Sequence, residues 1–445
     1  MNQIFMKEKP ILPLVLSMSL PMVISMLVNS LYNIIDSFFV AKISEDAMTA
    51  LSLVYPLQNL IMAIGVGFGI GINTTVAFFL GAKKKEYANN AATQGIILNT
   101  IHGIILTIGC ILIIPYFLKI FTNNINVIDY GLRYSNIVFL FSVVITVGVT
   151  FEKVFQSVGK MVVSMISMMS GCIVNIILDP VLIFGLGAAP KMGMEGAAIA
   201  TGIGQVVTLL IYIIFYVTKP MPIHFEFRKQ LTEEKLFQRL YAVGIPATLN
   251  MALPSLLITV LNGILAAYSQ IYVLTLGIYY KLQTFIYLTT NGIVQGIRPL
   301  VGYNYGAGEH KRVLNIHKTA LCLAMIVMAM GMCICLFAPK SLMQLFATNE
   351  KTIAAGVTAL RIISMGFIVS AISVVATGTL EGLGKGTLSL VISLMRYVII
   401  IIPIAFVLSK WIGATGVWHA FWITEVLTAI ISYVIIKKPQ NHTVL

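Results

Sequence analysis

The sequence predicts an all-α integral membrane protein with twelve transmembrane helices in two pseudo-symmetric six-helix bundles. Three observations lead to this prediction. The composition is apolar, since 58% of the 445 residues are hydrophobic and 10% are charged, against about a quarter charged in soluble proteins. The chain contains twelve apolar runs of membrane-spanning length, and its two halves share short motifs at a nearly constant offset.

The composition also excludes several classes of protein. A soluble chain of this size could not bury so much apolar side chain, so a disordered chain, a nucleic-acid-binding domain and an ordinary cytoplasmic enzyme are excluded. The five cysteines lie inside apolar runs without metal-ligand or redox spacing. No nucleophile trio, metal cluster or nucleotide-binding loop is recognisable, so we expect neither enzymatic activity nor a cofactor.

The spans follow from the length rule that a membrane helix needs about 20 mostly apolar residues. Twelve runs satisfy it, at 13–41, 51–80, 91–115, 131–152, 161–186, 194–217, 241–268, 272–303, 315–338, 355–378, 387–409 and 414–436. The polar segment 218–240 divides the chain near its middle. We therefore expect an N-terminal lobe at 1–217, a cytoplasmic linker at 218–240 and a C-terminal lobe at 241–445.

The basic residues predict the orientation. Of the 29 lysines and arginines, eighteen, including Lys153, lie in segments on the side of the termini, six lie on the opposite side and five lie in or near spans. Positive residues accumulate on the cytoplasmic side, so both termini are predicted to be cytoplasmic in the plasma membrane. The net charge of +13 then reflects the orientation of the chain in the membrane and does not indicate a nucleic-acid partner.

An internal repeat relates the two halves. Three matched pairs are offset by 225 residues and a fourth by 220: Leu20-Pro21 with Ile245-Pro246, Gly81-Ala82 with Gly306-Ala307, Gly159-Lys160 with Gly384-Lys385, and Gly193 with Gly413. Because each copy has an even number of spans, both have the same topology, with a symmetry axis along the membrane normal. Transporters built in this way bind substrate near the midplane and expose it alternately to the two sides.

The motifs at these positions resemble the multidrug and toxic compound extrusion (MATE) family, particularly its bacterial branch of MepA-like pumps. The resemblance covers nearly the whole chain and is carried by Asn33-Ile34-Ile35-Asp36, Leu80-Gly81-Ala82-Lys83, Gln156-Ser157-Val158-Gly159-Lys160, Asn175-Ile176-Ile177-Leu178-Asp179-Pro180, Arg298-Pro299 and Leu380-Glu381-Gly382-Leu383-Gly384-Lys385. It implies a V-shaped pair of lobes around a central cleft. It also implies export of lipophilic, often cationic, drugs in exchange for H⁺ or Na⁺. We expect a monomer in the lipid bilayer.

Two carboxylates deep in spans are functional candidates, because a charge in the bilayer core is costly. Asp36 lies in span 1 on one helical stripe with Asn29, Tyr32 and Asn33. These three residues, with Gln205 of span 6, are candidates for lining the substrate cleft. Asp179 lies in span 5, one turn after Asn175. Both spans run from the inside outwards, so the two carboxylates can lie at similar depth.

Span 6 adds Thr201 and Gln205, four residues apart, which completes a predicted oxygen-rich pocket in the N-terminal lobe. Two adjacent buried carboxylates cannot both ionise cheaply, so the pair can take up a proton, and the same oxygens can instead hold Na⁺. The family resemblance implies an ion site at Asp36, Asn175 and Asp179, with Thr201 as the best match for a fourth position. The alternative is that these groups only hydrogen-bond three helices together.

The repeat predicts that this site is confined to one lobe. At the offset of 225, Asp36 corresponds to Leu261, and Asp179 falls near Ile402. The C-terminal lobe therefore keeps the scaffold without the carboxylates. We expect ion coupling in the N-terminal lobe.

The sequence leaves two alternative roles for each of three charged residues in the C-terminal lobe. Arg396 and Glu425 can form a buried pair, either a structural ion pair or part of the substrate cleft, and Lys281 can face the cleft or extend outwards. The alternative function is a lipid-linked saccharide flippase of related fold. A flippase needs several basic residues for a pyrophosphate group, and this chain offers mainly Lys281 and Arg396.

Overall fold

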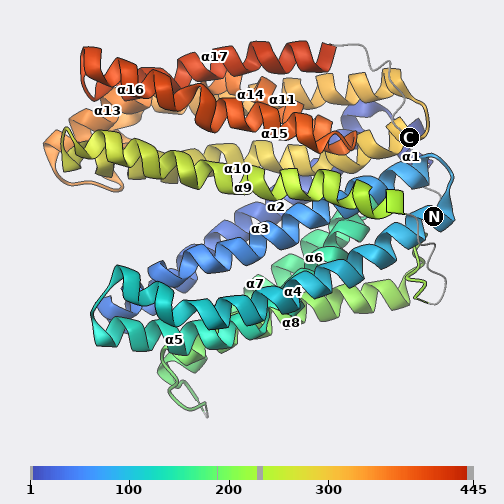
Figure 1. Ribbon diagram of the computed structural model, residues 1–445, viewed down its shortest axis with the longest axis horizontal. Helices are drawn as coiled ribbons and strands as arrows, with labels where there is room; N and C mark the ends of the chain where they lie inside the picture. Colours follow the sequence, from blue (N-terminus) through green and yellow to red (C-terminus); the bar gives the residue numbers. More distant parts are fainter. Residues whose placement is uncertain (1–3, 188, 228–233, 438–445) are drawn as a thin grey trace. The chain divides into compact units, whose positions relative to one another are not determined.

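The computed structural model describes residues 4–187, 189–227 and 234–437, and over these residues the chain is all-helical, without a β-strand. Its first half contains α1 (Phe5–Glu8), α2 (Ile11–Ala41), α3 (Glu45–Gly81), α4 (Lys85–Phe121), α5 (Ile125–Leu140), α6 (Ser142–Ser157), α7 (Met161–Phe184) and α8 (Met194–Thr218). Its second half contains α9 (Glu234–Ala266), α10 (Gln270–Gly306), α11 (His310–Phe337), α12 (Pro339–Gln344), α13 (Glu350–Ser364), α14 (Phe367–Gly382), α15 (Gly386–Leu394), the π-helical turn η1 (Met395–Ile399), α16 (Ile401–Ile412) and α17 (Thr415–Lys437) (Figure 1).

The helices form two compact units. Unit 1 comprises Met1–Met6 and Ile24–Thr248, and unit 2 comprises Lys7–Val23 and Leu249–Leu445. Helix α2 therefore begins in unit 2 and ends in unit 1, and helix α9 begins in unit 1 and ends in unit 2. The predicted lobes at 1–217 and 241–445 stay a prediction, and part of the predicted linker, residues 228–233, lies outside the described residues.

The helices correspond in order to the twelve predicted spans. Among the described residues, nine helices are long and apolar enough to cross a bilayer, and the bent pairs α5–α6 and α13–α14 bring the number to eleven. The remaining predicted span is α10, which has 37 residues and carries polar side chains such as Lys281 and Arg298. Its length exceeds the 20 or so residues that a bilayer requires.

Two spans that the sequence presents as single runs are broken. Helices α5 and α6 meet at 45°, and α13 and α14 meet at 57°. Near each break a serine hydroxyl donates to a helix carbonyl, Ser142 to Phe139 at 2.6 Å and Ser364 to Arg361 at 3.2 Å. A serine hydroxyl that bonds to a helix carbonyl competes with the backbone hydrogen bonds, and this can bend a helix that has no proline. Hydropathy does not reveal the breaks, because the flanking residues on both sides are apolar.

The helix ends repeat with the same offset as the sequence motifs. The side chains of Ser44 and Ser269, 225 residues apart, cap the first turns of α3 and α10. Asn124 and Asn349, again 225 apart, cap α5 and α13 in the same way. The repeat therefore includes the residues that start the helices, which supports a common fold for the two halves.

Helices α7 and α8 cross closely at two glycines. A Cβ atom on Gly204 would lie 2.8 Å from the backbone oxygen of Gly171 and 3.2 Å from Cβ of Asn175. Small residues let the backbones of membrane helices approach in this way. The crossing places Asn175 of α7 against α8, where Thr201 lies.

Candidate functional site

The four residues predicted to form an ion site lie close together inside unit 1. Asp36 of α2 and Asp179 of α7 lie next to each other and are electrostatically coupled. Both are buried, with 8% of Asp36 and none of Asp179 exposed. On the neighbouring turn of α7, Nδ2 of Asn175 donates to Oγ1 of Thr201 on α8 at 3.4 Å. Three helices that are distant in sequence therefore bring the four predicted coupling residues together.

The site holds several buried oxygen atoms without a hydrogen-bond partner. They are Oδ1 of Asp36, both carboxylate oxygens of Asp179 and Oδ1 of Asn175. Unsatisfied buried acceptors are costly, and a cation satisfies them. The donor set consists of oxygen alone, which suits Na⁺ as a hard cation, and the adjacent carboxylates equally suit a proton. The arrangement fits either coupling ion as a transported substrate.

Three further residues, Tyr32, Tyr134 and Gln58, lie around Asp36. Tyr32, one turn before it on α2, interacts with Asp36 and with the hydroxyl of Thr201. Tyr134 of α5 lies beside the same groups, and Nε2 of Gln58 on α3 donates to its hydroxyl at 3.2 Å. Sequence reasoning missed Tyr134 and Gln58. The only available signal was a polar residue in an apolar span, which many structural residues share.

A cavity of about 80 Å³ adjoins this site, and we call it the unit 1 cavity. It is lined by Asn29, Tyr32, Met62, Ile145, Gly148, Val149, Glu152, Met168, Gly171, Cys172, Asn175, Thr201, Gly204, Gln205, Thr208 and Tyr212. Of the residues predicted for the substrate cleft, it brings together Asn29, Tyr32 and Gln205. Such a volume has room for several water molecules.

The other predicted cleft residues lie elsewhere. The Asn33 side chain is exposed and donates to the backbone oxygen of Asn29 at 2.7 Å. Lys281 is also exposed, with its ammonium 5.9 Å from the centre of the Phe346 ring. Membership of all these residues in one substrate cleft stays a prediction.

Arg396 and Glu425 form an ion pair inside unit 2. Nε and Nη2 of Arg396 donate to Oε1 of Glu425 at 2.9 and 2.6 Å. Nη2 also donates to the hydroxyl of Tyr287 at 3.3 Å, and that hydroxyl donates to Ser370 at 2.7 Å. The π-helical turn η1 carries Arg396, whereas its counterpart in the first half, α7, is a regular α-helix.

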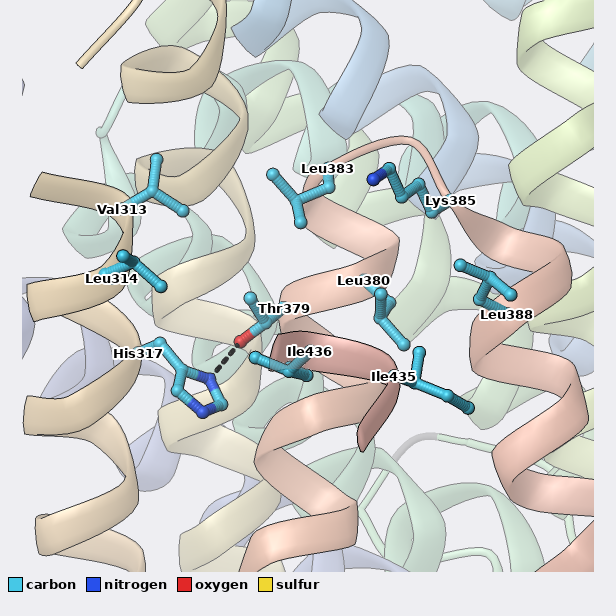
Figure 2. Close-up of a pocket in the computed structure, with 10 residues that line it drawn as sticks. All are labelled: Val313, Leu314, His317, Thr379, Leu380, Leu383, Lys385, Leu388, Ile435 and Ile436. Atoms are coloured by element: carbon cyan, nitrogen blue, oxygen red, sulfur yellow. Dashed lines mark hydrogen bonds between the residues drawn. The ribbon is translucent and has the colours of Figure 1, made fainter. Parts of the chain in front are cut away.

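A much smaller hollow of about 20 Å³ lies between α11, α14, α15 and α17 in unit 2. Figure 2 shows that mostly apolar side chains surround it, with Nδ1 of His317 bonded to the hydroxyl of Thr379 at 2.9 Å. Lys385 contributes the only ammonium group among the residues drawn there. The space is sufficient for about one water molecule and too small for a drug.

The MatE family model matches residues 21–181 and 246–407, one stretch in each half. Multidrug export protein MepA of Staphylococcus haemolyticus is 28% identical over 439 residues, covering 98% of this chain and 96% of that protein. The protein of the same name from Staphylococcus aureus is 26% identical over 440 residues, covering 97% and 95%.

Solved structures agree on the fold. An outward-facing multidrug resistance MATE family transporter of the MOP superfamily superposes with a TM-score of 0.90 at 22% identity, covering 98% of this chain and 97% of that one. A MOP superfamily transporter from Pyrococcus furiosus gives a TM-score of 0.91 at 22% identity with the same coverage. These similarities confirm the predicted fold class, a twelve-helix membrane protein of the MATE type.

Proposed function

The chain belongs to the MatE family, and on that premise we propose that it is a secondary active multidrug efflux transporter. It exports lipophilic and cationic compounds by antiport with H⁺ or Na⁺, through alternating access. The MepA proteins, with which it aligns over nearly its whole length, are multidrug exporters by name. This similarity supports transport rather than catalysis as the activity.

The observation that carries the coupling proposal is the closeness of the buried carboxyl groups of Asp36 and Asp179. Two carboxylates together in a buried site repel each other until a proton or Na⁺ reduces their charge. Ion binding would therefore pull α2 and α7 together, and ion release would push them apart. Drug affinity would follow ion occupancy, because Tyr32 and Asn175 contact both this site and the unit 1 cavity. A ligand shifts a conformational equilibrium only through such differential binding.

The chain is a multi-pass membrane protein. We propose that it resides in the plasma membrane as a monomer, with both termini in the cytoplasm. The support for this orientation is the excess of basic residues in the segments on the side of the termini. Its partners would be the bilayer and the small molecules it exports.

A lipid-linked saccharide flippase is not favoured. Such a protein needs free basic groups for a pyrophosphate, and the Arg396 guanidinium is already paired with Glu425. Lys281 is exposed and lies over Phe346. The buried oxygens of Asp36, Asn175 and Asp179 that lack a hydrogen-bond partner are acceptors, which suit a cation instead.

Purified protein in liposomes tests the proposal most directly. A proton gradient and a sodium gradient are imposed separately. The measurement is the uptake of a fluorescent lipophilic cation into liposomes in which the protein is inserted inside out. We expect uptake with one of the two gradients and its collapse with the matching ionophore, without any need for ATP. Uptake that requires ATP, or that ignores both gradients, would refute antiport.

A further inference from the structure

The unit 1 cavity extends well beyond the ion site. On α8 it is lined by Thr201, Gln205, Thr208 and Tyr212, which follow one face of the helix. From Thr201 to Tyr212 the helix rises by about 16 Å, since an α-helix rises 1.5 Å per residue. This distance is roughly half the thickness of the hydrocarbon core. The cavity therefore follows the helix from the ion site towards the end of unit 1 where α8 ends at Thr218.

The outer end of the cavity is connected to the carboxylates by polar groups. Neither Asp36 nor Asp179 lines the cavity, but Tyr32, Asn175 and Thr201 do. The Tyr32 hydroxyl interacts with Asp36 and Thr201, and Asn175 donates to Thr201. Hydroxyl and amide groups therefore lie between the two carboxylates and the cavity.

The inner end of the cavity holds a charged cluster that the ion site does not use. Glu152 of α6 lines the cavity, and its Oε1 accepts from Nζ of Lys153 at 2.8 Å and from Nε2 of Gln156 at 2.6 Å. The side chains of Glu152 and Lys153 are only 11% and 3% exposed. Counting Lys153 among the cytoplasmic basic residues did not anticipate this burial, because the count depends on sequence position alone.

The groups around Glu152 come from four helices. The titratable ones are Lys153 on its own helix and Tyr212 on α8, which interacts with Glu152 and whose hydroxyl bonds to the backbone oxygen of Ser164 on α7. From α3, Asn73 donates to the backbone oxygen of Lys153 at 3.0 Å. Glu152 is therefore held in place with one compensating cation.

The charges at the positions of this cluster differ between the two halves. At the offset of 225, Glu152 corresponds to Thr377 and Lys153 to Gly378, which are not ionisable. Asn73 and Gln156 of the same cluster correspond to Arg298 and Glu381, which form a buried ion pair at 2.7 Å in unit 2. Both halves therefore bury an ion pair in this region, but at different positions. The Glu152–Lys153 pair is distinguished by its place, because Glu152 lines the cavity that adjoins the Asp36–Asp179 site.

We infer that Glu152 is the inner proton relay of this transporter, connected to the Asp36–Asp179 pair by water in the unit 1 cavity. The inference rests on the proposed antiport and assigns its coupling ion as H⁺. The Lys153 ammonium, 2.8 Å from the Glu152 carboxylate, repels Na⁺. A proton can bind to Glu152 in spite of this ammonium, because it forms an O–H bond to the carboxylate oxygen.

The relay step balances without any other reactant. A carboxylic acid in the Asp36–Asp179 pair gives its proton to a cavity water, and a proton from the far end of the water chain bonds to the Glu152 carboxylate. The neutral acid leaves Lys153 as a buried unpaired cation, which is costly. Glu152 therefore releases the proton to cytoplasmic water and restores the ion pair.

The test measures drug-driven proton movement in proteoliposomes with a trapped pH dye. Glu152→Gln should slow this flux by about tenfold or more, because a positioned proton-transfer group contributes at least that much. Equilibrium drug binding should change by less than about twofold, since Glu152 lies at the inner end of the cavity. Glu195→Gln removes a carboxylate of α8 outside the relay and should leave the flux unchanged.

The double variant Glu152→Gln/Lys153→Gln separates a relay from a structural ion pair. It has no unpaired buried charge, so a purely structural pair predicts recovery of wild-type flux. The relay predicts flux as slow as in Glu152→Gln, and recovery would overturn it. A wild-type protein that couples to Na⁺ alone would also overturn the relay, but would leave the proposed antiport intact.

Cys172 provides an independent readout of water in the cavity, which it lines. In a variant that keeps only Cys172, a small water-soluble thiol reagent should modify it much faster than it modifies Cys110 in the matching single-cysteine variant. Cys110 is also buried, with 4% exposed against 7% for Cys172, but lies in an apolar cluster with Ile114 and Leu118. Equal rates would show that the cavity is dry and would overturn the relay.

Discussion

Arg396 directs two hydrogen bonds to the same oxygen of Glu425 and leaves the other, Oε2, buried without a partner. The two side chains are only 8% and 12% exposed. The pair is therefore desolvated, and only one of its two carboxylate oxygens is satisfied by the arginine. Breaking a desolvated pair by removing one charge is far more costly than removing both.

This difference predicts the stability of variants at the pair. Arg396→Gln alone should destabilise the protein by about 3–5 kcal/mol, because it leaves the Glu425 carboxylate buried without a counter-ion. Arg396→Gln/Glu425→Gln should recover most of that loss. Thermal unfolding in detergent, followed by loss of the monodisperse elution peak, measures both. Equal stability of the single variant and the wild type would mean that water reaches the pair.

Removal of either coupling carboxylate should abolish drug efflux. Asp36→Asn and Asp179→Asn keep the shape of the side chain but remove the charge that attracts the ion. Resistance of an efflux-deficient host should fall to the level of the host without the transporter, while membrane insertion is retained. Asp129→Asn, the same change at an exposed aspartate of α5, is the control and should confer full resistance. Wild-type resistance of both site variants would refute coupling in this unit.

The crossing of α7 and α8 should be intolerant of a methyl group. Gly204→Ala places a Cβ 2.8 Å from the backbone oxygen of Gly171, so the helices must separate. We expect a loss of about 1–3 kcal/mol, as for other overpacked cores. Because Asn175 is also displaced, drug efflux should fall as well.

Gly109→Ala is the matched control for this substitution. Gly109 lies inside α4, and a Cβ there meets nothing within 4 Å. Alanine should gain up to about 1 kcal/mol of helix stability, because glycine is the poorer helix former. The two alanine variants should therefore shift the unfolding temperature in opposite directions. Equal shifts would argue against a close helix crossing at Gly204.

A surface ion pair in unit 2 predicts a modest pH dependence. The ammonium of Lys7 bonds to Glu309 at 2.7 Å and, through this hydrogen bond, lowers the pKa of the Glu309 carboxyl below its ordinary 4.5. The same contact raises the pKa of Lys7 above 10.5. The contribution of Glu309 is present above pH 4.5 and is lost as the pH falls through its lower folded pKa. That of Lys7 is present below 10.5 and is lost as the pH rises through its higher folded pKa.

The matching variant is Glu309→Gln. It should unfold at a slightly lower temperature than the wild type at pH 7, because both groups are charged there. The difference should disappear well below pH 4.5 and in high salt, which screens exposed charges. A difference that persists under both conditions would show that Glu309 stabilises the protein by packing instead.

Several features could be predicted because they depend on neighbours along the chain. A run of 20 or so apolar residues is sufficient to predict a span, and α2, α7 and α8 lie close to their predicted limits. Asp36 and Asp179 were recognisable because a carboxylate in such a run is rare. The repeat extends to the caps of α3 and α10 at Ser44 and Ser269, since capping is a local property of the sequence.

Other features depend on which helices pack together, and the sequence alone did not reveal them. Tyr134 lies beside Asp36 although 98 positions separate them in the chain, and nothing local marks the contact. Hydropathy likewise does not show that Lys153 is buried against Glu152, nor that spans four and ten bend at residues 141 and 366. In the bilayer every strip of a helix can be apolar, so the pattern along one span does not specify its partners. Close contacts such as Gly171 against Gly204 select them, and these contacts exist only once the helices have packed.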